Sequence, residues 1–263
     1  MNPIIFKQNY TVVILVIISL IAINISSASD FPLREKYKNI PIIELNTLGE
    51  ELSDTIVIDV RSKAEYNVIH IANAHNIPLS NMGFTSKVQN LRKENPNKKI
   101  IVYCNGHTCA KSYKATKKLM DSNIDNCYAF DAGIFDWVNK YPENSSLLGE
   151  SPADLSKIIS KDEFKQHTLE SDNFENKLNS TKNSIIIDIR ESVQRSFSPN
   201  YNNIRNIPFD RFTKALKNNK YKDKTLFIFD AVGKQVKWLQ YHLKNYNYKN
   251  YYFLKGGVKT LQS

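Results

Sequence analysis

The chain contains few cysteines. Only three occur in 263 residues, at positions 104, 109 and 127, and residues 128–263 contain none. An odd number cannot be paired completely within one chain, so at least one thiol stays free or takes part in chemistry. The spacing also lacks the two ligand pairs of a zinc motif, so we expect neither a metal site nor a cofactor.

The chain also lacks an apolar run of the roughly 18 to 20 residues that a membrane-spanning helix needs. Its longest such run, residues 11–25, follows Lys7 and precedes the small residues 26–29. A short positive start, an apolar centre and a small-residue exit are the parts of a secretory signal. We therefore expect residues 1–29 to direct export to the periplasm. The alternative is an uncleaved anchor facing the periplasm, which would be the chain's contact with the membrane.

Acidic residues are scarce in the second half. Residues 1–150 carry 16 basic and 15 acidic residues, whereas residues 151–263 carry 20 and 11, and the net charge is +10. The chain has no nucleic-acid recognition motif, and an exported protein would not meet nucleic acid, so we expect no such partner. Small anions or acidic partners fit the charge better, and the alternative is a solvated lysine-rich surface.

One β-branched run ends abruptly in a cysteine. Residues 100–103, Ile-Ile-Val-Tyr, predict a buried strand that delivers Cys104 to a turn of small and polar residues, with a helix beginning near Ala110. Turn amides and the positive end of a helix stabilise a thiolate and the anion that it attacks. The alternative is a core thiol at a strand end. Cys127 lies on another predicted strand and is expected in the core.

The two halves of the chain repeat the same segments in the same order, which indicates duplication. Apolar strands alternate with helical patterns in each half, as in α/β domains with a mainly parallel sheet flanked by helices. We expect domains at 38–141 and 160–263, joined by a linker at 142–159. The corresponding segments are residues 54–66 and 184–191, 76–78 and 206–208, 99–104 and 224–230, and 127–137 and 251–258.

The first half resembles a rhodanese domain. The resemblance rests on the order and spacing of five segments: Ile-Asp59-Val-Arg61, Glu65-Tyr66, residues 70–78, Tyr103-Cys104 and residues 133–137. It covers residues 40–141, and a weaker match covers residues 160–260. The whole chain therefore resembles a tandem-domain sulfurtransferase of the thiosulfate sulfurtransferase type. That family implies two α/β domains, with an active-site loop at the end of one strand.

The resemblance implies that Cys104 takes a sulfane sulfur as a persulfide. Thiosulfate would be the donor, and the acceptor would be cyanide in an assay or a physiological thiol or partner protein. Attack on the donor requires a thiolate, so we expect a lowered pKa at Cys104. The substrate would be cradled by the four residues that follow, whose N–H groups can turn inward. These are Asn105, Gly106, His107 and Thr108.

The loop departs from the family pattern at its sixth position, where a basic residue is common and Cys109 stands here. The missing cation would come from Lys111, with Arg61 as the second candidate. Their alternatives are a solvated helix lysine and a buried ion pair. For Cys109 we favour redox coupling to Cys104 through a disulfide, while loop tuning and simple packing stay open.

In the second half, Asp230 stands where the first half has Cys104. A carboxylate cannot carry a persulfide, so we expect this domain to be catalytically silent. Its role would be structural, and its basic residues, with Lys234 and Lys237 flanking the silent loop, would attract anions. The alternative to an enzyme is a non-enzymatic envelope module, for redox chemistry, sulfur binding or protein interaction, with a Cys104–Cys109 disulfide.

Overall fold

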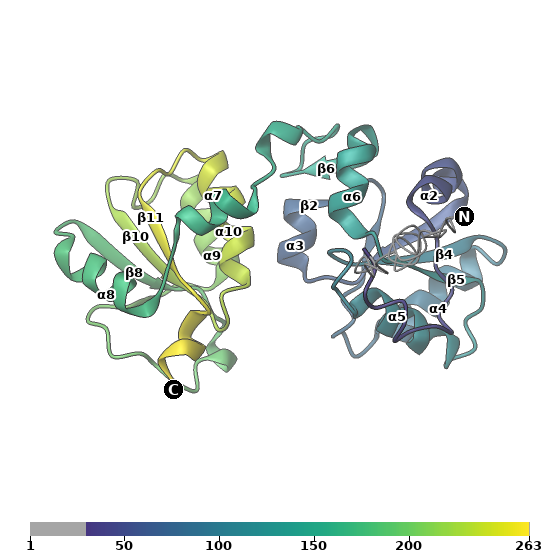
Figure 1. Cartoon of the computed structure of the whole chain (residues 1–263), viewed down its shortest axis with the longest axis horizontal. Coiled ribbons are helices and arrows are strands. Elements are labelled where there is room, and N and C mark those ends of the chain that lie inside the picture. The colour runs from purple at the N-terminus through teal and green to yellow at the C-terminus, as the bar shows by residue number, and fades with distance from the viewer. Residues whose placement is uncertain (1–29, 263) are drawn as a thin grey trace, which may run out of the picture.

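Short runs of Ile, Val, Phe and Tyr form the strands of two parallel sheets in the computed structural model, which describes residues 30–262. The two sheets belong to two α/β domains (Figure 1). The predicted signal segment, residues 1–29, lies outside the described residues. Within residues 30–262, no helix has both the length and the apolar character needed to cross a bilayer.

The first domain is built on a four-stranded sheet in the order β3-β1-β4-β5, with every pair parallel. Its central strands are buried on both faces, as expected when helices cover both sides of a parallel sheet. A separate pair, β2 and β6, is antiparallel. The elements are α2 (Leu45–Glu51), β1 (Thr55–Asp59), α3 (Lys63–Val68), β2 (Ile69–Ile71), β3 (His75–Asn76), α4 (Phe84–Glu94), β4 (Lys99–Tyr103), α5 (Lys111–Met120), β5 (Cys127–Phe130), α6 (Gly133–Lys140) and β6 (Ser145–Leu147).

The second domain has a five-stranded parallel sheet in the order β7-β11-β10-β8-β9. Its core contains more phenylalanine and tyrosine than that of the first domain. The elements are α7 (Lys161–Gln166), β7 (Thr168–Leu169), α8 (Ser171–Ser180), β8 (Ser184–Asp188), β9 (Arg205–Asn206), α9 (Phe209–Lys217), β10 (Thr225–Phe229), α10 (Gln235–Asn245) and β11 (Tyr251–Leu254), with short 3-10 turns between them and at the C-terminus.

The sequence repeat is confirmed as a structural repeat. The order β3-β1-β4-β5 matches β9-β8-β10-β11, and a parallel bridge from Ile42 to Ala129 takes the place of the edge strand β7. After the first strand of each repeat, an aspartate accepts hydrogen bonds from the backbone and guanidinium of the arginine two residues later. The predicted fold class is therefore correct.

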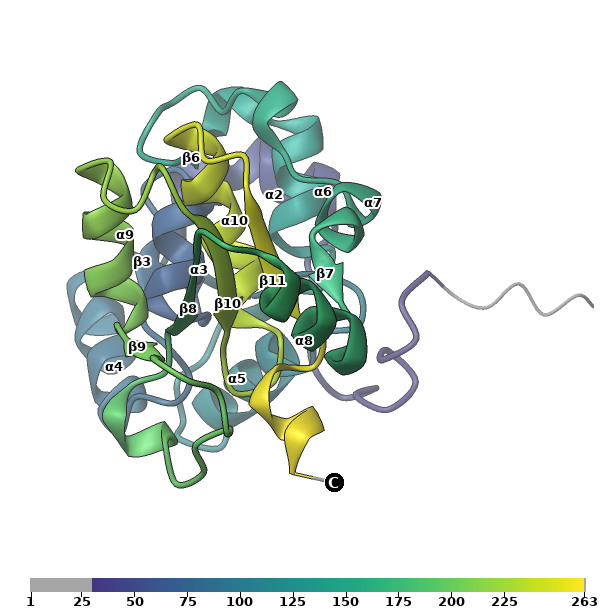
Figure 2. The same cartoon turned by 90° about the vertical axis from the view of Figure 1, so that its left-hand side faces the viewer.

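The predicted linker is packed rather than extended. Residues 145–147 form β6, which pairs with β2, and the amide of Ile159 donates to the Tyr241 hydroxyl at 3.3 Å. The two domains meet where α3 lies beside α10, as the view with the second domain in front shows (Figure 2). Phe135 stacks on Trp238 across this boundary, with ring centroids 6.1 Å apart. The carboxyl ends of both sheets thus border a shared space.

Candidate active site

Residues 104–110 form the active-site loop, which connects β4 to α5. The amide of Cys109 donates to the carbonyl of Gly106 at 2.7 Å, and Gly106 has a φ of +134°. A Cβ at Gly106 would lie 2.9 Å from the carbonyl oxygen of Ala132, so glycine is required here. The close neighbour that requires glycine is therefore the backbone of Ala132.

Cys104 is buried completely at the end of β4. The Cys104 sulfur lies 3.1 Å from the carbonyl oxygen of Cys109 and 3.6 Å from the Ser112 hydroxyl. Apolar core residues surround it. Burial therefore raises the pKa of Cys104 well above its ordinary value. The expectation of a lowered pKa at Cys104 is wrong, because the strand end places this sulfur in the core.

Cys109 has the properties that were expected of Cys104. Its side chain is half-buried and lines a pocket. A hydrogen bond from the Cys104 thiol, together with the backbone amides of Lys111 and Asn105 and the charge of Lys111, lowers the pKa of Cys109 to about 6. The two thiols share one negative charge, and that charge belongs on Cys109 because the amides and the more exposed position stabilise it there.

A network of four polar side chains supports the loop beside Cys109. The Asn105 amide nitrogen donates to Glu65 at 2.9 Å, and Glu65 also accepts from the backbone and hydroxyl of Ser62, which caps α3. Lys111, predicted to supply a cation for the substrate, lines the pocket, with its ammonium 3.9 Å from the Glu65 carboxylate. Asn105 therefore acts as a brace through its side chain and as an amide donor to Cys109 through its backbone.

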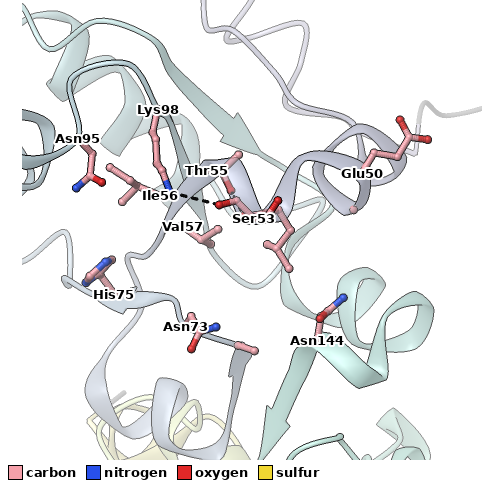
Figure 3. Close-up of a pocket in the computed structure, with 13 residues that line it drawn as sticks. Glu50, Ser53, Thr55, Ile56, Val57, Asn73, His75, Asn95, Lys98 and Asn144 are labelled. Atoms are coloured by element: carbon pink, nitrogen blue, oxygen red, sulfur yellow. Dashed lines mark hydrogen bonds between the residues drawn. The ribbon is translucent and has the colours of Figure 1, made fainter.

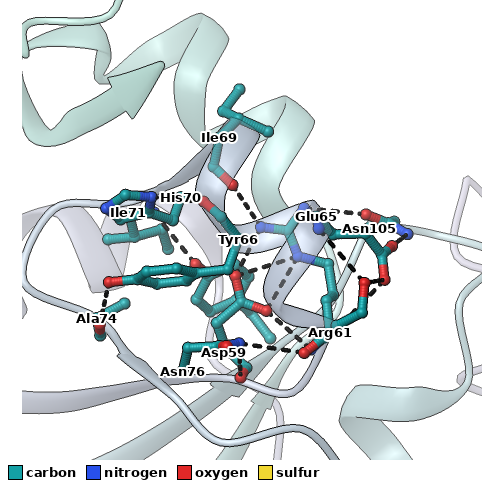
Figure 4. A network of polar contacts seen from close by, with 12 residues as sticks. Asp59, Arg61, Glu65, Tyr66, Ile69, His70, Ile71, Ala74, Asn76 and Asn105 are labelled. Atoms are coloured by element: carbon teal, nitrogen blue, oxygen red, sulfur yellow. Dashed lines mark hydrogen bonds and ion pairs between the residues drawn. The ribbon is translucent and has the colours of Figure 1, made fainter. Parts of the chain in front are cut away.

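Arg61 does not bind substrate in this geometry. It is fully buried, forms an ion pair with Asp59 at 2.6 Å, and donates to the Ile69 carbonyl at 2.6 Å and to the Asn105 side chain at 3.1 Å (Figure 4). The Trp238 ring covers its guanidinium at 5.7 Å. All its donor groups face protein acceptors, so Arg61 fills the alternative role of a buried ion pair that organises the loop.

The middle of the loop faces two directions. Thr108, one of the residues predicted to cradle the substrate, lines the pocket. His107 does not; its Nε2 lies 2.7 Å from the Asp136 carboxylate, and its ring stacks on Phe31 at 4.3 Å. Partial burial lowers the pKa of His107, but the Asp136 carboxylate outweighs it and raises the pKa overall. The predicted substrate contact of His107 is therefore replaced by a link to α6 and to the segment before α2.

The pocket beside Cys109 lies between the domains and has a volume of about 570 Å³. The first domain contributes Cys109, Lys111 and Phe135, and the second contributes Lys237 and Trp238 among others. Phe135 and Trp238 thus form an aromatic wall of this pocket, which also contains several lysines and the Cys109 thiol. Pockets at the carboxyl ends of parallel strands are the usual ligand sites of α/β folds.

A second hollow of about 540 Å³ lies at the opposite end of the first sheet, where β1 begins (Figure 3). Its lining includes His75, Asn95 and Lys98, but the Lys98 ammonium donates to the carbonyl of Ser53. It contains no cysteine and none of the lysines that surround Cys109. The chemistry of the molecule therefore points to the pocket between the domains.

Comparison with known proteins agrees with this architecture. A family model described as a rhodanese-like domain matches residues 44–140 and again residues 170–263. The chain belongs to the rhodanese-like family. This family has members that are enzymes.

Two curated relatives match part of this rhodanese-like chain. Both are tRNA uridine(34) hydroxylases, from Photorhabdus laumondii subsp. laumondii and from Enterobacter sp. (strain 638), each 29% identical over 91 and 101 residues respectively. The matches cover 34% and 38% of this chain but 25% and 28% of the relatives. The chain thus spans about a quarter of the length of these relatives.

Solved structures with a similar fold include a thiosulfate sulfurtransferase from Pseudomonas aeruginosa, 16% identical, with a TM-score of 0.38, covering 85% of this chain and 42% of that one. A human single-domain sulfurtransferase is 20% identical, with a TM-score of 0.32, and covers 39% of this chain and 98% of its own.

The second rhodanese-like domain has its own loop, residues 230–234, with Asp230 in the place of Cys104. The Asp230 carboxylate is buried and accepts four backbone amides, including those of Val232 at 2.9 Å and Val236 at 3.1 Å. The other two donors are Gly233 and Gln235. These amides point at one centre, so the carboxylate occupies the place that a bound anion would take.

Sequence reasoning missed the aromatic wall of this rhodanese-like site. Phe135 lies within the segment of the family resemblance, but nothing in its spacing distinguishes it from a core residue. Trp238 lies 103 positions further along the chain, and its ring meets that of Phe135 only across the boundary between the folded domains. A prediction of which residues face across that boundary needs the structure.

Proposed function

We propose that this rhodanese-like protein is a sulfurtransferase that carries a sulfane sulfur on Cys109. The observation that supports this most strongly is the lowered pKa of Cys109 at the pocket wall, with two backbone amides and Lys111 stabilising the thiolate. Most of its sulfur is charged at neutral pH, and the thiolate is the nucleophilic form. Thiosulfate or a similar sulfane donor is the substrate that this site fits.

In the first step the Cys109 thiolate attacks the outer sulfur of thiosulfate. A sulfur–sulfur bond forms on Cys109, the sulfur–sulfur bond of thiosulfate breaks, and sulfite leaves with the electron pair. In the second step a thiophilic acceptor attacks the outer sulfur of the persulfide and returns Cys109 to its thiolate. The acceptor is cyanide in an assay and a thiol or a partner protein in the cell.

The choice of Cys109 changes the prediction from sequence, which assigns the persulfide to Cys104. Cys104 is buried and has a raised pKa, but its thiol stabilises the charge on Cys109. We propose that Cys104 is a positioning residue. Persulfide on Cys104 is the competing assignment. Both cysteines lie in the stretch between Lys99 and Lys111, so the two assignments differ in which residue of one peptide carries the added sulfur in its fragment ions.

The test combines an assay with peptide mapping. Wild type, Cys109→Ser, Cys104→Ser and the matched control Cys127→Ser are treated with thiosulfate, and peptides are analysed by mass spectrometry for one added sulfur. In wild type we expect the added sulfur on Cys109. Among the variants, only Cys109→Ser should lose thiosulfate-to-cyanide transfer, to near background. Added sulfur on Cys104 in wild type would restore the sequence-based assignment, and no added sulfur in wild type would reject the function.

A second candidate function follows from the contact between the two loop thiols. Cys104 and Cys109 are both unpaired in the structure and adjacent, so oxidation could join them in a non-enzymatic redox module. Thiol counting on protein isolated without reductant separates the cases. Three free thiols support the sulfurtransferase, and one free thiol supports the disulfide form.

We also propose that the protein acts after export, with residues 1–29 as its signal. N-terminal sequencing of the protein from fractionated cells tests this. A periplasmic chain that begins near residue 29 supports a cleaved signal, an intact chain in the membrane fraction supports the anchor, and an intact chain in the cytoplasm rejects export.

A further inference from the structure

The active-site loop has no free cation of its own for an anionic donor. Arg61 is engaged by Asp59, Ile69 and Asn105, and the Lys111 ammonium lies 3.9 Å from Glu65. The sixth loop position, where the family pattern has a basic residue, is Cys109. A doubly charged substrate therefore needs positive charge from elsewhere around the pocket.

Lys237, in the first turn of α10, has the right position for that role. It is half-buried at the pocket and lies 5.3 Å from the Phe135 ring of the first domain. Within residues 30–262 it forms no hydrogen bond and no ion pair, whereas Lys244 on the same helix pairs with Glu163 at 2.6 Å. An ammonium that has lost part of its water without gaining an anion is a candidate ligand for one.

The charges around Lys237 leave it available. Burial and the charge of Lys161 lower its pKa, and the smaller effect of the Glu65 charge raises it. Lys234, one turn earlier, also lines the pocket and forms no ion pair in the described part of the chain. Asp230, the acidic residue that the second domain contributes to the same pocket, is already held by four backbone amides. The lysines therefore face the pocket and not their own loop.

We propose that Lys237 of the silent domain binds the anionic end of the sulfur donor and so supplies the cation that the active-site loop lacks. This inference rests on the proposed sulfur transfer and names its substrate class, a donor with a sulfonate group. Lys237 holds the sulfonate oxygens while the outer sulfur faces Cys109. The site is thus composite, with the nucleophile from one domain and the anion-binding group from the other.

Binding is tested first with sulfate, which resembles the sulfonate but carries no transferable sulfur. The readout is the rate at which neutral iodoacetamide alkylates Cys109, followed by peptide mass spectrometry. We expect sulfate to slow alkylation in wild type, and Lys237→Gln to need about tenfold more sulfate for the same protection, as for one lost charge-assisted hydrogen bond. Lys237→Arg should keep most of the protection.

Kinetics supply the second readout. In Lys237→Gln the KM for thiosulfate should rise about tenfold with kcat little changed, while transfer from an uncharged organic trisulfide should not change. The matched control is Lys217→Gln, which removes an exposed lysine at the end of α9, outside the pocket. It tests whether net charge alone explains the effect, and circular dichroism checks that each variant folds.

The outcomes separate this inference from the function on which it rests. Protection by sulfate that is lost in Lys237→Gln, in a protein that transfers no sulfur, would support the anion site and reject the sulfurtransferase. If Lys237→Gln transfers sulfur with an unchanged KM for thiosulfate, the role of Lys237 is rejected and the sulfurtransferase function stands. The role of Lys237 would also be overturned if Lys237→Gln and Lys217→Gln changed sulfate protection and KM equally, or if sulfate did not protect wild type.

Discussion

Removing the Cys104 thiol tests the electrostatics of the site directly. Cys104 stabilises the Cys109 thiolate by donating a hydrogen bond, and this is the largest of the effects that lower the pKa of Cys109. Cys104→Ala deletes the donor but keeps a small apolar side chain in a buried position. We therefore expect the Cys109 pKa to rise while the loop keeps its shape.

The size of the shift follows from the strength of a charged hydrogen bond. Such a bond contributes about 1.5–3 kcal/mol, and each pKa unit corresponds to about 1.4 kcal/mol. Water from the pocket replaces part of the lost donor, so we take the lower end, about one unit. The Cys109 pKa would move from about 6 to about 7.

The assay is the pH dependence of Cys109 alkylation by iodoacetamide. The thiolate is the deprotonated form, so the rate rises as pH increases through the pKa. At pH 6 the thiolate fraction falls from about one half to about one tenth, so Cys104→Ala should react about fivefold more slowly, and the two rates should converge near pH 9. Cys104→Ser keeps a hydroxyl donor and should shift less.

Cys127→Ala is the matched control, because Cys127 is buried in β5 and burial raises its pKa to about 11. It should leave the alkylation profile of Cys109 unchanged. The reasoning fails if Cys104→Ala leaves the pH midpoint of Cys109 alkylation at its wild-type value. It also fails if Cys104, and not Cys109, is the thiol that reacts near pH 6 in wild type.

Three further changes test the supports of the site. Arg61→Met leaves the Asp59 carboxylate buried without its cation, so we expect the free energy of unfolding in urea to fall by about 3–5 kcal/mol. Gly133→Ala would place a Cβ 2.4 Å from the amide nitrogen of Gly106 at a φ of +69°, which should cost about 1–3 kcal/mol in the same measurement and alter the alkylation rate of Cys109. Asp230→Ala leaves four buried amides without an acceptor, so we expect a lower thermal midpoint that sulfate partly restores.

Each of these three changes has a control variant or an outcome that would contradict the prediction. Gly149→Ala, at a φ of +85° with no atom within 4 Å of the new Cβ, should be destabilised without any change in Cys109 alkylation. A near wild-type unfolding curve for Arg61→Met would mean that the ion pair has no organising role. An Asp230→Ala protein whose thermal midpoint is unchanged, or is indifferent to sulfate, would contradict the picture of a loop built around an anion.

The order of elements could be predicted because it depends on local pattern. The run before Cys104 is β-branched and apolar, and it forms β4; the repeated Asp-x-Arg segments follow equivalent strands in the two sheets. Buried strands of this kind are indicated by the spacing of apolar residues along the sequence, which involves only neighbouring positions. The helix predicted to begin near Ala110 begins at Lys111, with Ala110 as its N-cap.

The direction of each side chain in the loop could not be predicted in the same way. Cys104 and Cys109 differ by five positions, and the turn at Gly106 decides that one sulfur enters the core and the other the pocket. Arg61 lies next to the loop, but it is fully buried and each nitrogen of its guanidinium has a protein acceptor, which only the structure shows. Such outcomes depend on three-dimensional packing.

The buried carboxylate of Asp230 determines the stoichiometry of the molecule. A duplicated chain would ordinarily offer two equivalent loops, and a substrate anion would divide between them. Here one loop holds an anion that is covalently part of the chain and cannot be exchanged, oxidised or loaded with sulfur. If the proposed sulfur transfer holds, each chain carries one transferable sulfur, and titration with donor should end at a single equivalent with a simple saturation curve.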